Sequence, residues 1–200
     1  MDSSNSEFKL HPKAQDLLFQ YYRTLSRIFN DVLGHLEIDY ISITLLNDQN
    51  ELLFLSSRPS IECNLIEHHL WSFDRSLHAD FFQKNTAQLW ETLYPEKWRT
   101  QLRHYKQEIP GYSMGVSIPS SFEEYRVVYS FALKSNNAII KNNIMHKIEI
   151  LLRMGRFCLQ NIIKKIPLPD RTTENTSILT GKKPSLTLIT NQQVHYEKST

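Results

Sequence analysis

The spacing of apolar residues changes along the first third of the chain, and the change predicts a helix followed by two strands. From residue 11 to Gly34, apolar side chains recur three or four positions apart, which is the period of one helix face. Gly34 is placed to end this helix, because glycine adopts the left-handed conformation at little cost. Residues 39–46 and 51–56 are instead β-branched or apolar runs around the turn-forming residues 47–50, which is typical of a β-hairpin.

The middle of the chain combines a short helix with a segment rich in aromatic residues. Residues 61–71 have a helical pattern, with Ser60 as the candidate N-cap. Residues 71–105, the aromatic lobe, hold eight aromatic side chains, including all 3 tryptophans of the chain. Aromatic residues line most small-molecule pockets, but they also fill ordinary cores. Both interpretations of the lobe stay open at the level of sequence.

The second half of the chain predicts two more strands and a long helix. Residues 112–118 and 125–133 are the strands, joined by a turn at 119–121, and the second is apolar enough for the middle of a sheet. Residues 138–166 follow an Asn136-Asn137 cap and carry a broad apolar stripe, which covers a sheet or joins a second copy. This order of elements predicts an α+β fold, an α-β-α sandwich with a central antiparallel sheet of about five strands and helices on both faces.

The same elements divide the chain into three parts. We expect a polar N-terminal extension at residues 1–10, one domain at 11–166 and a polar, largely mobile tail at 167–200, where Pro167 stops the last helix. A chain of 200 residues can fold around a hydrophobic core without a metal or a disulfide.

Composition narrows the function by exclusion. A formal net charge of +2 is too small to indicate a nucleic-acid or membrane-surface partner. Only 5 glycines are present, and none of them forms a glycine-rich phosphate loop. No apolar run reaches the roughly 18 residues that span a bilayer, and the N-terminus has no signal-peptide core. We therefore expect a cytoplasmic protein, with export by a route that needs no N-terminal signal left open.

One catalytic motif occurs in the sequence, in an unfavourable context. Gly111, Ser113 and Gly115 match the GxSxG nucleophile elbow, and Asp170 and His195 follow in the order of α/β-hydrolases. The elbow requires a buried strand before the serine and a helix after it, whereas here a polar stretch precedes the serine and an extended one follows. We expect no catalytic residue, and a serine hydrolase is kept as the lesser alternative. The dispersed histidines lack metal-ligand spacing, so we expect no metal and no cofactor.

Several short blocks of the sequence resemble the sensor domain of LuxR-type quorum-sensing regulators of transcription. These blocks are 115–119 followed by 125–133, 40–56 followed by Pro59, 70–74, and 89–90. In that family the autoinducer-binding, PAS/GAF-like domain is an α-β-α sandwich that encloses an acyl-homoserine lactone between the sheet and one helical layer. The resemblance covers residues 15–165, roughly, and implies the same fold without the family's DNA-binding helix-turn-helix domain.

The resemblance also implies a ligand site. Asp74 matches the aspartate that accepts a hydrogen bond from the ligand amide, Trp90 the tryptophan that packs on the lactone ring, and Gly115 the glycine that opens the pocket wall. Ser130 matches a strand hydroxyl that reaches a ligand carbonyl, and Trp71 lies in the same block as Asp74. Each matched residue also has a plain structural explanation, as a turn cap, a core ring, a turn glycine or a strand hydroxyl.

Two positions depart from the family pattern. Ile61 and Leu65 stand where the family has a tryptophan and a tyrosine that hydrogen-bond the ligand, and their side chains cannot donate. An acyl-homoserine lactone would leave polar atoms unpaired there, at a cost of roughly 1–3 kcal/mol each.

Two hypotheses about function follow. The first is a sensor for an acyl-homoserine-lactone-like or other partly apolar small molecule, which acts through a partner or as a homodimer through 138–166 and makes no direct contact with nucleic acid. The alternative is a protein-interaction module, such as a bacterial effector, that keeps the scaffold but fills the pocket with its own side chains.

Overall fold

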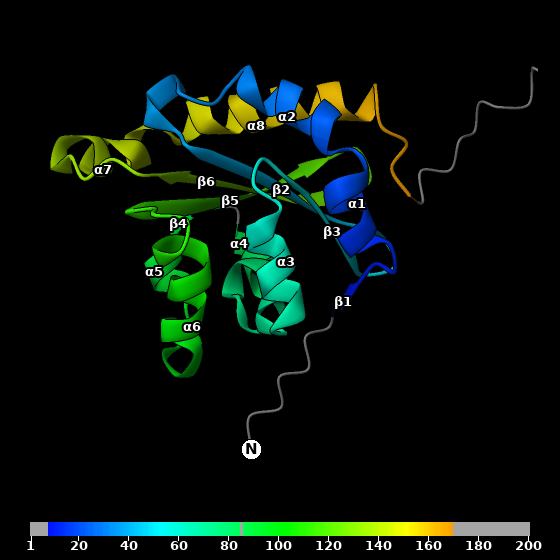
Figure 1. Cartoon of the computed structure of the whole chain (residues 1–200), viewed down its shortest axis with the longest axis horizontal. Coiled ribbons are helices and arrows are strands. Elements are labelled where there is room, and N and C mark those ends of the chain that lie inside the picture. Colours follow the sequence, from blue (N-terminus) through cyan, green and yellow to red (C-terminus); the bar gives the residue numbers. More distant parts are fainter. Residues whose placement is uncertain (1–7, 85, 170–200) are drawn as a thin grey trace, which may run out of the picture. The chain divides into compact units, whose positions relative to one another are not determined.

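A six-stranded sheet forms the central layer of the described part of the chain, in the order β1-β3-β2-β6-β5-β4 (Figure 1). The computed structural model describes residues 8–84 and 86–169. Its strands are β1 (Lys9–Leu10), β2 (Tyr40–Leu46), β3 (Glu51–Ser56), β4 (Gln88–Leu89), β5 (Met114–Phe122) and β6 (Tyr125–Leu133). All neighbouring strands are antiparallel except β1 and β3. The predicted sandwich and its antiparallel sheet are confirmed, and the two-residue strand β1 brings a parallel pair at one edge.

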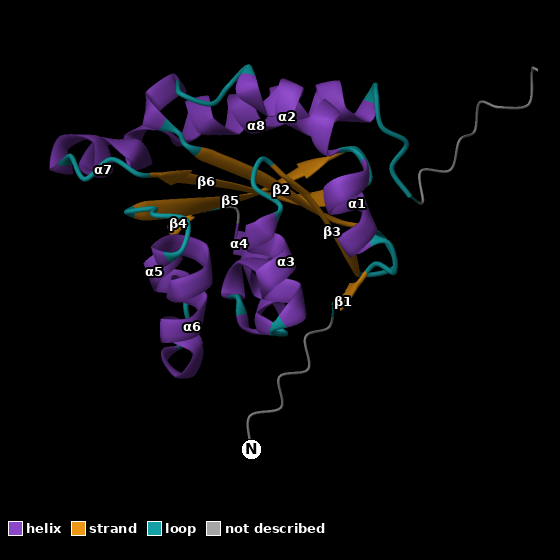
Figure 2. Cartoon of the chain, in the orientation of Figure 1, coloured by secondary structure: helices purple, strands orange, loops and turns teal. Residues whose placement is uncertain are grey.

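Helices cover both faces of this sheet (Figure 2). One face carries α2 (Tyr22–Asn30), α7 (Ala138–Ile144) and α8 (Ile148–Ile163), and α1 (Ala14–Gln20) lies beside β3. The other face carries α3 (Ser60–Glu67), α4 (Ala79–Lys84), α5 (Trp90–Leu93) and α6 (Arg99–Arg103), followed by a π-helical turn (His104–Glu108). We call this second set the α3–α6 layer. The 3₁₀ turns are His35–Glu37, Leu70–Phe73, Arg75–Leu77, Glu96–Trp98 and Met145–Lys147.

The side chains of β6 alternate between two separate hydrophobic cores. Tyr129 and Phe131 belong to the core under α2 and α8, whereas Val128 and Ala132 belong to the core against the α3–α6 layer. Because successive side chains of a strand point to opposite faces, a strand covered on both faces needs apolar residues at nearly every position. The continuous apolar run at 125–133 is thereby explained, and its predicted place inside the sheet is confirmed.

Both long helices predicted from the sequence are broken, so those two predictions are wrong as single elements. The first ends at Tyr21, which has φ −109° and ψ 16°, and the chain restarts as α2. The break lets Leu18 pack into the core of the α3–α6 layer while Leu25 and Phe29 pack into the opposite core. The helix predicted at 138–166 contains the 3₁₀ turn Met145–Lys147 between α7 and α8. The side chain of Asn137 does cap α7, because its Oδ1 accepts a hydrogen bond from the main-chain N–H of Ile139 at 2.9 Å.

Two local predictions are also corrected. Pro59, and not Ser60, occupies the N-cap position of α3, with no side-chain capping bond. The turn expected at 119–121 lies instead at Glu123 and Glu124, where Glu123 has a φ of 51°. Residues 119–121 continue β5, since the register pairs Pro119 with Val128 and the ladder runs on to Phe122.

Among the described residues, no helix combines the length and the apolar character that a membrane span needs. The predicted extension at 1–10 and tail at 167–200 lie largely outside the described residues and stay predictions.

Candidate functional site

The residues matched to a ligand site all lie between the sheet and the α3–α6 layer. Trp90 opens α5 and has none of its surface exposed. Ile61 and Leu65 of α3 belong to the same core, and Trp71 packs against it while half-buried. The sequence resemblance therefore selected residues that share one site, although their role in binding stays a prediction.

Trp90 is fitted closely into the sheet through Gly115 and two serines. A Cβ atom on Gly115 would lie 2.1 Å from Cδ2 of the Trp90 ring, so only glycine lets the indole lie against β5. The indole Nε1 donates to the hydroxyl of Ser117 at 3.0 Å, and that hydroxyl lies 2.8 Å from the hydroxyl of Ser130. Ser130 and the indole N–H are thus tied into an internal chain of hydrogen bonds.

Asp74 is buried, and both of its carboxylate oxygens have partners within the chain. Oδ1 accepts hydrogen bonds from the main-chain N–H of Ser76 at 3.0 Å and from its hydroxyl at 2.7 Å, which caps the turn Arg75–Leu77. Oδ2 accepts a hydrogen bond from the ammonium group of Lys106 at 2.5 Å. Burial alone would raise the pKa of Asp74, but the Lys106 charge and the bonds from Ser76 outweigh it and hold this pKa below its ordinary value.

Lys106 is a residue of this candidate site that the sequence pattern did not single out. It lies in the π-helical turn after α6 and is only 4% exposed. Its ammonium lies 4.3 Å from the centre of the Trp90 ring and 5.5 Å from that of Tyr94, within cation–π range of both. The polar run around Lys106 reads as a solvated face, yet Lys106 follows the buried Leu102 by four positions. That spacing was the one signal that Lys106 points inward.

The space where the resemblance puts the ligand is therefore occupied by a side chain of the protein itself. The Lys106 ammonium lies between the aspartate expected to bind a ligand amide and the ring expected to cover a lactone. Asp74 and Ile61 are each 1% exposed and Leu65 is 4% exposed, so little of their surface is open to solvent or to a void that would hold water.

A second buried polar centre lies in α3, next to Ile61. The hydroxyl of Tyr40 donates a short hydrogen bond to Oε1 of Glu62, and both side chains are buried. Burial raises the pKa of the Glu62 carboxyl, against the opposing effect of the Tyr40 hydrogen bond. Within the described residues, Glu62 Oε2, Tyr94 Oη and Gln107 Oε1 are buried without a hydrogen-bond partner. Such groups are costly, so this layer holds unused hydrogen-bonding capacity.

The GxSxG motif does not have the geometry of a nucleophile elbow. A π-helical turn precedes it and β5 follows it, which reverses the strand–turn–helix order that the elbow needs. The hydroxyl of Ser113 donates to the main-chain oxygens of Ser135 and Leu133, at 2.5 and 3.3 Å. Asp170 and His195 lie outside the described residues. No cluster of three or more metal-ligating side chains occurs within 8–84 and 86–169.

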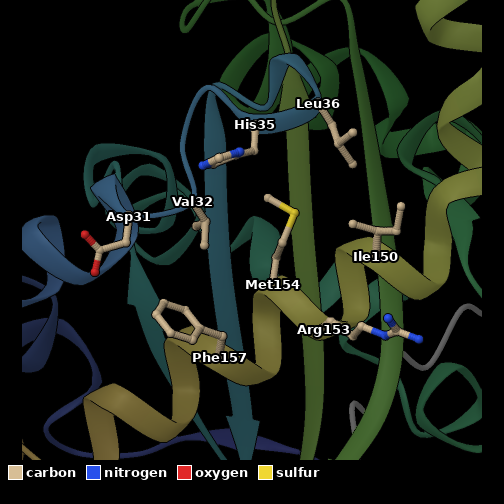
Figure 3. Close-up of a pocket in the computed structure, with 8 residues that line it drawn as sticks. All are labelled: Asp31, Val32, His35, Leu36, Ile150, Arg153, Met154 and Phe157. Atoms are coloured by element: carbon tan, nitrogen blue, oxygen red, sulfur yellow. The ribbon is translucent and has the colours of Figure 1, made fainter.

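Two cavities of the described part lie elsewhere. One, of about 440 Å³, lies between α8 and residues 31–36, which follow α2, on the opposite face of the sheet (Figure 3). Apolar side chains of Val32, Leu36, Ile150, Met154 and Phe157 line it, with Asp31, His35 and Arg153 around them. The other, of about 340 Å³, is a polar pocket on the outside of the aromatic lobe. Neither is lined by Asp74 or Trp90.

The chain is similar to known proteins in structure but not in sequence. No family model matches the sequence, and no curated protein is similar to it in sequence. Among solved structures, the chain is similar to the LuxR-family transcription factor CepR2 of Burkholderia cenocepacia, which depends on N-acylhomoserine lactone, with a TM-score of 0.52 and 10% identity over 76% of this chain and 96% of that one. SdiA in complex with octanoyl-rac-glycerol gives 0.51 and 15% identity over 78% and 68%. A crystal structure of Escherichia coli SdiA gives 0.49 and 13% over 80% and 73%.

The described part of the chain therefore has the fold of the ligand-binding domains of LuxR-family regulators. The resemblance drawn from the short sequence blocks is confirmed at the level of the fold. No DNA-binding domain is evident in the described part of this chain.

Proposed function

We propose that this chain is a LuxR-type sensor scaffold that works as a protein-interaction module, with Lys106 in the place of a small-molecule ligand. The fold supports the sensor scaffold, and the ion pair between Lys106 and Asp74 supports the proposal that Lys106 takes the place of a ligand. The Lys106 ammonium lies against Oδ2 of Asp74, so the amide N–H of an acyl-homoserine lactone would have to displace this ammonium or share Oδ2 with it, and displacement would break a buried charge pair.

The proposal explains the two departures from the family pattern. Ile61 and Leu65 cannot donate hydrogen bonds to a ligand, and in a permanently filled interior no such donor is needed. A scaffold that no longer takes up a ligand acts through its surface, so its partner is another protein chain.

The test is a thermal-shift experiment on the full chain with acyl-homoserine lactones of several chain lengths and with octanoyl-glycerol. We expect no rise in Tm for the wild-type protein, because a ligand stabilises a protein only by binding its folded state. Lys106→Ala empties the space beside Asp74 and is expected to gain a rise in Tm with the same compounds. Lys97→Ala, which removes an exposed lysine of the same layer, is the matched control and is expected to behave like the wild type. A clear rise in Tm of the wild-type protein would overturn the proposal.

A second candidate function, small-molecule sensing, is favoured by the unpaired buried groups. Within the described residues, Glu62 Oε2, Tyr94 Oη and Gln107 Oε1 have no partners, and a partly apolar ligand that displaced Lys106 would offer them polar groups. The same wild-type thermal-shift panel decides between the two candidates.

The partner we propose is a second copy of the chain, bound through α8. Ile150 and Phe157 are 46% and 45% exposed, and with Met154 they form an apolar strip at helical spacing. Figure 3 shows Asp31 and Arg153 on opposite sides of the apolar side chains. A two-fold axis through the strip brings Asp31 of each copy against Arg153 of the other, so the face is complementary to itself.

A further inference from the structure

The polar cavity of about 340 Å³ on the outside of the aromatic lobe is separate from both the filled interior and the α8 face. Its lining comes from the turn Arg75–Leu77, from α4 and from the segment β4–α5. A volume near 300 Å³ is at the lower end of small-molecule sites. The cavity is therefore large enough for a compact ligand, and its chemistry can be taken from its walls.

Cationic groups dominate the ionisable side chains of this lining. Arg75 and Lys84 carry permanent charges, and neither has a carboxylate within ion-pair distance among the described residues. Three other basic side chains of the α3–α6 layer are paired: Arg99 with Glu96, Arg103 with Glu91, and Lys106 with Asp74. Unpaired cations around a concave surface attract an anion, since the cavity concentrates their field.

Hydrogen-bonding groups complete the lining. His78 Nε2 lies 3.0 Å from the main-chain oxygen of Ser72, and since that oxygen only accepts, Nε2 carries the proton and Nδ1 is left for another partner. The amide of Gln88 lies in the same wall, as does the hydroxyl of Thr92, which donates to the main-chain oxygen of Leu89 at 2.7 Å. An arginine fork with the donor of the Gln88 amide beside it suits a phosphate group, which accepts several bonds at once.

The remaining walls define what the phosphate is attached to. Phe81 and Leu93 are buried residues that form apolar parts of the lining, against which carbon atoms pack. Asp80 places one carboxylate in the lining, which accepts hydrogen bonds from hydroxyl groups but repels a second anionic group. A ligand with one phosphate and several hydroxyls satisfies both ends of the cavity.

We propose that this cavity binds a phosphate monoester of a small polyol, in the size range of a sugar phosphate. Arg75 and Lys84 hold the phosphate, and His78 Nδ1 and Asp80 accept hydrogen bonds from the hydroxyls. The site is coupled to the interior through one short turn, because Arg75 follows Asp74 directly and Ser76 donates both of its hydrogen bonds to Asp74. The proposal does not depend on whether the interior is filled.

The test is isothermal titration of the full chain at low salt with glucose 6-phosphate, glucose, inorganic phosphate and sulfate. We expect heat of binding with glucose 6-phosphate and none with glucose. Arg75→Gln combined with Lys84→Gln is expected to weaken binding tenfold or more, by about the strength of one charge-assisted contact. Both residues are exposed, so the variant keeps its core. Lys13→Gln combined with Arg23→Gln removes two exposed cations, one just before α1 and one in α2, and is the matched control, with no change expected.

Asp80→Asn separates the two ends of the cavity. This variant is expected to bind inorganic phosphate more tightly than the wild type, because it lacks a negative charge. The difference in affinity between glucose 6-phosphate and inorganic phosphate is expected to shrink. Equal affinity for glucose 6-phosphate in the charge-removal and control variants would overturn the proposal. So would equal binding of phosphate and sulfate by every variant, which indicates unspecific ion binding, or no binding of glucose 6-phosphate by the wild-type protein.

Discussion

Lys106 and Asp74 form a buried charge pair, and removing either charge is expected to lower the free energy of unfolding. Lys106→Met keeps the length of the side chain but removes its charge, which leaves a buried carboxylate without a counter-ion. Breaking a buried pair in this way typically costs 3–5 kcal/mol, roughly, of unfolding free energy. We expect a loss of this size in denaturant unfolding, and a smaller loss in the double variant Asp74→Asn, Lys106→Met.

The exposed pair of Lys9 and Glu51 provides the matched control for this prediction. Its nitrogen and oxygen lie 3.0 Å apart, but the Lys9 side chain is 67% exposed. Exposed pairs contribute up to about 1 kcal/mol, so Lys9→Met is expected to change stability little. Additive losses in Asp74→Asn and Lys106→Met would contradict the coupling of the buried pair.

Glu62 gives stability a dependence on pH that can be isolated with one substitution. Burial raises the pKa of its carboxyl above the unfolded value of about 4.3, so the folded chain binds this proton more tightly. The stabilisation from the protonated group is complete below the unfolded pKa and is lost as pH rises through the folded pKa. Glu62→Gln does not titrate and still accepts the Tyr40 hydrogen bond. We expect its unfolding free energy to gain on the wild type as pH rises from about 4 to 7.

The measurement for Glu62 is a series of urea unfolding curves across that pH range. Glu67→Gln, at an exposed position of the same helix, is the control and is expected to stay parallel to the wild type. A difference between Glu62→Gln and wild type that does not change with pH would show that this carboxyl has the same pKa in the folded and the unfolded chain.

At the scale of whole elements, Gly155 lets α8 lie close to the Tyr129 ring of β6. A Cβ on Gly155 would lie 2.4 Å from Cδ1 of Tyr129, inside the core. In an exposed helix Gly→Ala is stabilising by about 1 kcal/mol, but forced overpacking costs about 1–3 kcal/mol. We expect Gly155→Ala to lower the unfolding free energy, and Tyr129→Val in the same chain to restore part of it. A Gly155→Ala variant more stable than the wild type would mean that α8 shifts freely on the sheet.

The four long strands of this fold were predictable, whereas the two-residue strands β1 and β4 and the helix breaks were not. A strand covered on both faces shows a continuous apolar run, as at 125–133, and its length and its β-branched and aromatic residues distinguish it from a buried helix segment. The breaks at Tyr21 and at Met145–Lys147 leave the three-to-four spacing intact, because both halves still bury one face. Periodicity reports which residues are buried, but it does not report which of two cores receives them.

The candidate site divides in the same way. Asp74, Trp90 and Gly115 were found through short blocks that resemble a family, since such blocks preserve residues in order. Lys106 lies in a run of polar residues with no block around it, and a single lysine that points inward is invisible in composition. Only the structure places its charge against Asp74.

At the scale of the whole molecule, we assign different roles to the two faces of the sheet. On the face toward the α3–α6 layer, hydrogen bonds join Trp90, Ser117 and Ser130, and Lys106 pairs with Asp74. These groups are satisfied within the chain, so this face presents little surface for a second chain to bind. The opposite face leaves Ile150 and Phe157 almost half exposed over the cavity between α8 and residues 31–36. Exposed apolar side chains grouped on one face mark an interaction surface.

Self-association through α8 makes the last prediction, and charge reversal tests it more sharply than removal of apolar area. Phe157→Asp is expected to give a monomer in light scattering at micromolar concentration, whereas Ile109→Asp, at an exposed apolar position on the other side of the sheet, is expected to leave a dimer. Asp31→Arg or Arg153→Asp alone opposes like charges across the two-fold axis and weakens the dimer, while the two together restore opposite charges. A purely hydrophobic contact would not show this restoration, and a wild-type chain that is monomeric throughout would remove α8 as the meeting point of two copies.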